Sequence, residues 1–94
     1  GAQVVEFHTG RYCHLSGDDR AVEFERLQAA ATRAFDLGLE VHAGHGLDYV
    51  TAAHMMAIAE VRELNIGHFL IGEAVFVGLP TAIHRMRAAM EAAA

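Results

Sequence analysis

The sequence is poor in several residue types, and each shortage excludes a class of protein. Cys13 is the single cysteine, so no disulfide can form within the chain, and a reducing, cytoplasmic location is expected. Lysine is absent, and the scattered arginines are outnumbered by acidic residues, seven to twelve, which gives a net charge of −5. Without a basic stripe, nucleic acid is not an expected partner.

Long apolar runs are missing too. The most apolar window, residues 66–80, is interrupted by glycines, His68 and Glu73, whereas a membrane span needs roughly 18 uninterrupted apolar residues. We therefore expect no membrane partner, and no signal peptide is visible. Yet 53% of the 94 residues are hydrophobic, which is rich for a small domain. The surplus apolar surface is expected to be covered by other protein, as in a piece of a longer chain.

Hydrophobic spacing predicts strands that alternate with helices. Strands are expected at 4–8, 39–44 and 62–67, helices at 19–37, 49–59, 68–78 and 79–93, and a polar loop at 11–19. Ser16 and Asp19 have capping-box spacing, Gly38 and Asp48 can end and begin helices, and Pro80 fits a first helical turn. The apolar faces of the first and last helices are expected to be Phe24, Leu27, Ala31, Ala34 and Phe35, and Leu79, Ile83, Met86 and Met90.

This alternation implies an α/β fold with a parallel sheet and right-handed crossovers. A parallel sheet is normally buried on both faces, which three strands with helices on one side cannot achieve. The pattern is therefore consistent with the last three units of a (β/α)8 barrel, which needs about 250 residues. A fragment of a three-layer α/β fold is the alternative.

The stretch AGHGLD (43–48) places His45 between two glycines just after the second strand. Residues in this position line the active sites of parallel α/β proteins, and an imidazole can transfer protons near neutral pH. Gly44 and Gly46 would let the backbone approach a ligand, and the helix that starts near Asp48 would offer free N–H groups. The alternative is a glycine-rich turn with an incidental exposed histidine.

A second Gly-His pair, Gly67 and His68, follows the third strand and opens a short helix. In barrels, a phosphate site is often built from the last two strand-end loops and the N-terminus of a short extra helix. The alternative is that Gly67 serves only the turn geometry and that His68 caps the helix.

Glu6 and His8 share one face of the first strand, and Thr9 and Gly10 end it. Inside a barrel they would face the site; the alternative is a buried structural pair.

Other chemistries have little support. His42 and His45 are three apart, but the strand ends between them and no Cys cluster or second ligand pair accompanies them, so no metal site is expected. The segment GHGLDY lacks the G-x-G-x-x-G order of dinucleotide-binding turns. Cys13 has no evident activating base and is interpreted as incidental.

The segments EFHTG, AGHGL and ELNIGHFLIGEAVFVGL, in this order and spacing, closely resemble the C-terminal third of the pyridoxine 5′-phosphate synthase family. The resemblance covers essentially the whole chain. It implies that residues 1–94 are strands six to eight of one (β/α)8 TIM barrel, with a short extra helix before the last one. The N-terminal strands would be absent from this chain, so the fragment alone would be inactive.

The resemblance also implies the chemistry. These transferases of vitamin B6 biosynthesis condense 3-amino-2-oxopropyl phosphate with 1-deoxy-D-xylulose 5-phosphate, releasing water and phosphate, without a metal or organic cofactor. By this resemblance His45 is a proton donor, Gly46, Gly67 and His68 bind the amino-ketone phosphate, and Glu6 faces the site. The family's other acid–base residues, a histidine and a glutamate, belong to the missing strands. The resemblance implies a homo-octamer; a small non-catalytic βα association module, or a fragment of another phosphate-binding barrel, is the alternative.

Overall fold

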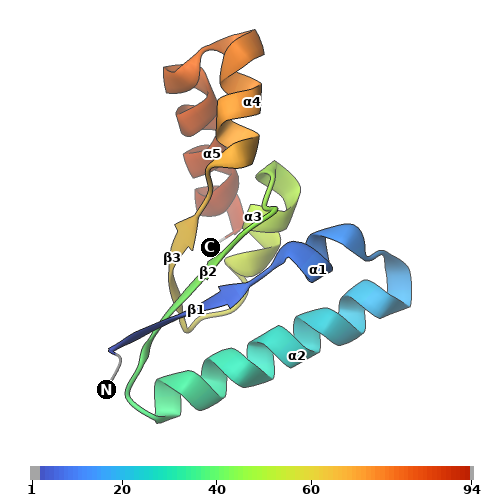
Figure 1. Cartoon of the computed structure of the whole chain (residues 1–94), viewed down its shortest axis with the longest axis vertical. Helices are drawn as coiled ribbons and strands as arrows, with labels where there is room; N and C mark the ends of the chain where they lie inside the picture. Colours follow the sequence, from blue (N-terminus) through green and yellow to red (C-terminus); the bar gives the residue numbers. More distant parts are fainter. Residues whose placement is uncertain (1–2, 94) are drawn as a thin grey trace.

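Three parallel strands form the only sheet in the part of the chain that our computed structural model describes, residues 3–93. They are β1 (Val4–His8), β2 (Glu40–Gly44) and β3 (Val61–Asn65), in the spatial order β1-β2-β3. The helices are α1 (Gly10–His14), α2 (Gly17–Asp36), α3 (Tyr49–Met55), α4 (His68–Val77) and α5 (Leu79–Ala93). The predicted α/β class and parallel sheet are confirmed (Figure 1).

The two faces of the sheet differ in character. Val5 pairs with Val41 and Phe7 with Ala43, and this face packs on the core formed with the helices. The opposite face carries polar side chains from all three strands: Glu6, His8, Glu40, His42, Glu63 and Asn65. Glu6 and His8 are exposed in the described residues; because a closed barrel would cover this face, the alternative of a buried structural pair stays a prediction. Within residues 3–93, the sheet therefore has one covered apolar face and one open polar face.

Helices α2 and α3 form largely where the sequence predicts them. On α2, Leu27, Ala31 and Ala34 are buried, although Phe35 is 52% exposed because the helix ends one residue later and turns at Gly38, whose φ is +84°. Ser16 is the N-cap of α2, but its side chain makes no capping hydrogen bond and the helix begins at Gly17 rather than Asp19. Helix α3 ends at Met55, four residues before the predicted end.

The segment 11–19, predicted as a loop, contains α1. Tyr12 fixes this short helix because its ring is buried in the core and its hydroxyl lies 2.7 Å from Nδ1 of His54. The Arg20 guanidinium lies 5.0 Å from the centre of the same ring. These contacts join residues far apart in the sequence, so tertiary packing forms a helix that local spacing does not predict.

Helices α4 and α5 lie side by side and project from one end of the sheet (Figure 1). Of the predicted apolar stripe of α5, Met86 is buried and Met90 is partly buried, whereas Leu79 and Ile83 are 45% and 41% exposed. They lie on the first turns of α5, where the helix runs beside α4 beyond the core. No residue of α4 is buried, and no helix within residues 3–93 is long and apolar enough to cross a bilayer.

Candidate active site

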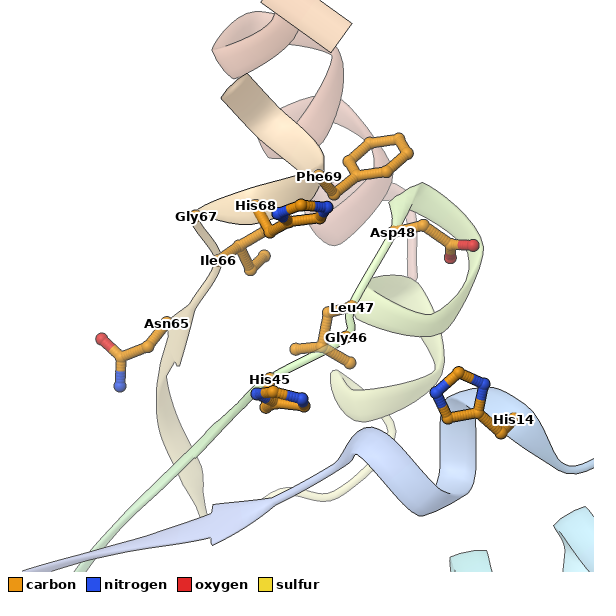
Figure 2. A pocket seen from close by; sticks show the side chains of 10 residues that line it. All are labelled: His14, His45, Gly46, Leu47, Asp48, Asn65, Ile66, Gly67, His68 and Phe69. Atoms are coloured by element: carbon orange, nitrogen blue, oxygen red, sulfur yellow. The ribbon is translucent and has the colours of Figure 1, made fainter. Parts of the chain in front are cut away.

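The turns that follow β2 and β3 meet at the carboxyl ends of the strands, as parallel pairing requires. Together they line a pocket of about 600 Å³ (Figure 2). Its lining residues are His14, His45, Gly46, Leu47, Asp48, Asn65, Ile66, Gly67, His68 and Phe69. Four residues predicted for the site, His45, Gly46, Gly67 and His68, thus line one pocket although the two pairs are separated by twenty residues of chain.

His45 has an unusual backbone conformation. Its φ is +85°, and it is the only described residue other than glycine with a positive φ. This region is sparsely populated by residues with a Cβ, and it persists only where the surroundings hold it. The His45 ring stacks on that of His8, with centroids 4.0 Å apart and planes inclined by 27°. The end of β1 therefore meets the turn after β2 directly beneath the candidate proton donor.

Bare backbone is needed at three glycines around this stack. A Cβ on Gly10 would lie 2.7 Å from both the His45 and the His8 rings. A Cβ on Gly44 would lie 2.9 Å from the backbone oxygen of Asn65, and Gly46 has a φ of +78°. The glycines on either side of His45 are thus explained by close packing at one and by a left-handed turn at the other.

Gly67 is different. It is the N-cap of α4 with a φ of −125°, and a Cβ built on it would meet nothing within 4 Å. No protein contact therefore requires glycine here, but its φ of −125° and ψ of −63° lie outside the helical and extended regions. A role of Gly67 in the turn geometry thus stays a prediction beside a role in binding a ligand. No side chain caps α4, and its first turn carries no acidic residue. The positive end of the helix dipole faces the pocket without an internal counter-charge, which suits an anion.

The N-terminus of α3 is already occupied. Asp48 accepts a hydrogen bond from the Thr51 amide at 2.8 Å, and the Thr51 hydroxyl accepts one from the Asp48 amide at 2.8 Å. The predicted cap is confirmed, but the prediction that this helix offers its N–H groups to a ligand is wrong for the amide that Asp48 binds. Burial raises the pKa of Asp48, but the hydrogen bonds from Thr51 outweigh it and hold the pKa below its ordinary 3.8.

Glu6 does not line the pocket itself. Its carboxylate accepts a hydrogen bond from the side-chain amide of Asn65, which does line it. A Cβ on Gly44 would also lie 2.9 Å from Oε1 of Glu6. The carboxylate thus sits on the open polar face of the sheet, one hydrogen bond away from the pocket.

Sequence reasoning missed several pocket residues. His14 reaches the pocket because the unpredicted α1 carries it there, and Asn65, Ile66 and Phe69 belong to the turn whose flanking Gly-His pair was recognised. The contact between His8 and His45 could not be read from spacing, because it depends on the pairing of His8 with Gly44.

The thiol of Cys13 contributes little to the chemistry of the pocket. Burial raises the pKa of the Cys13 thiol above its ordinary 9.0, despite a hydrogen bond with Thr51 that lowers it, so the thiol stays protonated near neutral pH. In the described residues 3–93, no three His, Cys, Asp or Glu side chains are grouped as metal ligands.

The family model described as pyridoxal phosphate biosynthesis protein PdxJ matches residues 1–92. The chain belongs to the PdxJ family.

Curated relatives of this PdxJ chain are named pyridoxine 5′-phosphate synthase. The protein of Caulobacter vibrioides is 63% identical over 97 residues, which cover 99% of this chain and 38% of the relative. That of Xanthobacter autotrophicus is 59% identical over 96 residues (98% and 37%), and that of Rhodospirillum rubrum 58% over 94 residues (99% and 38%). The chain spans a little over a third of the length of these relatives.

Proposed function

We propose that this chain is the C-terminal part of a pyridoxine 5′-phosphate synthase, which joins 3-amino-2-oxopropyl phosphate and 1-deoxy-D-xylulose 5-phosphate and releases water and phosphate. The observation that carries the proposal is the single pocket lined by both Gly-His turns, in a chain whose 58–63% identical relatives bear that name. The remaining strands and the rest of the substrate site would come from the other part of the barrel.

The open polar face of the sheet supports the barrel. Glu6, His42 and Asn65 make this face mostly polar, although Val4 also lies on it. The face therefore offers little apolar surface for the second helical layer that the alternative three-layer fold requires. Closure with further strands would turn this face inward and place the ends of all three strands at one mouth. Residues 1–94 would then be strands six to eight of one domain.

The phosphate of the amino-ketone would lie against the start of α4. Gly67 leaves space at the N-cap, and the first amides of a helix without a side-chain cap can bind a dianion without a cation. Gly46, with its left-handed backbone, would approach the same substrate from the opposite wall of the pocket, and His68 would contact it from the first turn of α4.

His45 would donate a proton during ring formation. Condensation of an amine with ketones and loss of water require repeated proton transfer, for which an imidazole is suited near neutral pH. The His45 side chain is exposed to the pocket, and its ring is supported from below by His8. Glu6, linked through Asn65, would act on the polar side of the reacting centre.

The proposal extends to the assembly. Val75 and Phe76 of α4 are 78% and 85% exposed, which is a large apolar surface for a free helix. A homo-oligomer, such as the octamer implied by the family resemblance, would cover it. The protein would work in the cytoplasm on small phosphorylated substrates.

The test is a chimaera in which residues 1–94 replace the matching segment of the Caulobacter vibrioides relative. With both substrates present, the chimaera should form pyridoxine 5′-phosphate and release an equal amount of inorganic phosphate, measured by mass spectrometry and a phosphate assay. Omission of either substrate should abolish both products. A folded chimaera that forms neither product would refute the proposal.

A further inference from the structure

We infer that Thr9 is a positioning residue that holds the backbone of His45 in its left-handed conformation and so aims the imidazole. The inference rests on the proposed function for its catalytic consequence, but it rests on the geometry of residues 9, 44 and 45 for its structural claim.

Thr9 is completely buried, and its hydroxyl has two acceptors. Its Oγ1 lies 2.8 Å from the carbonyl oxygen of Gly44 and 2.8 Å from that of His45. A hydroxyl has a single proton, so the two carbonyls share it in a three-centre bond. The Thr9 amide donates a further hydrogen bond of 2.8 Å to the Gly44 oxygen.

The positions of these two carbonyls depend on the backbone torsions of His45. The Gly44 carbonyl belongs to the peptide unit before the His45 Cα, and the His45 carbonyl belongs to the unit after it. Their relative orientation is set by φ and ψ of His45 alone. A single buried donor that contacts both therefore restricts the combinations of these torsions, and it favours the observed φ of +85°, which a histidine adopts only under constraint.

The side chain is aimed by the same contacts. Because the Cα–Cβ direction follows from the backbone, the Thr9 hydroxyl determines where the His45 ring leaves the turn. The stack on His8, the residue just before Thr9, then limits the ring's rotation. His8 and Thr9 thus support His45 in two ways, by ring contact and by backbone hydrogen bonds.

The test uses three variants of the chimaera. Thr9→Val keeps the shape and removes the donor, Thr9→Ser keeps the donor, and Thr32→Val makes the same change at an exposed position on α2. Thr9→Val should lower kcat about 10- to 100-fold, the range for a misplaced reacting group. KM should change less than about threefold, because the phosphate contacts are elsewhere, and Thr9→Ser should restore kcat to within about threefold. Thr32→Val should match the parent.

A crystal structure of each variant gives a readout that does not depend on activity. In Thr9→Val the φ of His45 should leave the positive region, and in Thr9→Ser it should remain there. If valine prevents folding, Thr9→Ala removes the donor without added branching and carries the same expectations. An unchanged kcat and an unchanged His45 φ in a folded donor-free variant would overturn the inference, as would a serine variant as impaired as valine. An inactive parent chimaera would instead refute the proposed function, and the crystal structures would still decide whether Thr9 holds His45.

Discussion

The turn after β2 and the helix α4 line the same pocket, yet they are stabilised in opposite ways. Around His45, this chain supplies a buried threonine, a stacked imidazole and two glycines, Gly10 and Gly44, that leave little room for a side chain. Helix α4 buries none of its ten residues, and Phe76 is 85% exposed. One wall of the pocket is held by buried contacts within this chain, and the other is a helix with no buried residue.

The glycines show the same contrast. Gly44 is packed against Asn65 and Glu6, and Gly46 requires a positive φ, whereas a Cβ on Gly67 would meet only open space. A substitution at Gly44 or Gly46 would disturb the fold as well as the site. A substitution at Gly67 would report on the ligand alone.

The largest effect is expected for His45→Asn, in the turn after β2 of the chimaera. Asparagine keeps polarity and tolerates a positive φ, but it cannot donate a proton with a suitable pKa. Loss of a general acid typically costs about 10²–10⁴ in rate, whereas substrate affinity should change far less. Single-turnover and steady-state rates measure the loss. Turnover within about threefold of the parent, which is under ~1 kcal/mol, would show that His45 is not the donor.

The next largest effect is expected at α4, which has no buried residue. The isolated 94-residue chain should self-associate, and Ile71→Gln with Phe76→Gln should weaken association by at least about 100-fold, since the two buried side chains together contribute about 3–6 kcal/mol. Sedimentation velocity over a range of concentrations measures this change. Val22→Gln, at a 66% exposed position of α2, is the matched control and should have no effect. A parent chain that stays monomeric throughout would contradict the account of α4.

A smaller effect is expected from Gly67→Val. The added Cβ meets no protein atom within 4 Å, so we expect the variant to fold, while an amino-ketone phosphate seated on α4 would be pushed away. We expect the dissociation constant measured by calorimetry to rise about tenfold, roughly 1.4 kcal/mol. Gly72→Val on the same helix also meets open space and should leave affinity unchanged. Equal affinities for the two variants would argue against phosphate at Gly67.

The smallest effect is expected at the cap of α3. Asp48→Ala should cost about 0.5–2 kcal/mol of unfolding free energy at pH 7, measured by urea denaturation of the chimaera. Because the folded pKa of Asp48 lies below its ordinary 3.8, its stabilisation is present above that value and is lost as the pH falls below it. The variant and parent should therefore converge as the pH falls below 3.8. A stability difference between Asp48→Ala and the parent that stays constant with pH would exclude this role.

Elements that depend on local contacts could be predicted from the sequence, whereas elements that depend on distant contacts could not. The three strands, α2 to α5, the Asp48 cap and the Gly38 turn depend on local spacing, and they were predictable. Helix α1 was not, because Tyr12 forms it through contacts with His54 and Arg20.

The site divides in the same way. The Gly-His pairs at 45–46 and 67–68 are visible as strand-end turns, and the structure brings them to one pocket. The contributions of His8 and Thr9 are invisible in the sequence, since they depend on the register that sets His8 opposite Gly44. The open space around Gly67 is likewise a property of the folded chain.

The most direct test of the central claim is a crystal structure of the chimaera with 3-amino-2-oxopropyl phosphate bound. The account predicts the phosphate within hydrogen-bond distance of the backbone amides at the start of α4, against Gly67 and His68, with the amino-ketone extending past Gly46 toward the His45 imidazole. A phosphate bound away from α4, or a ligand that leaves His45 facing only solvent, would contradict it.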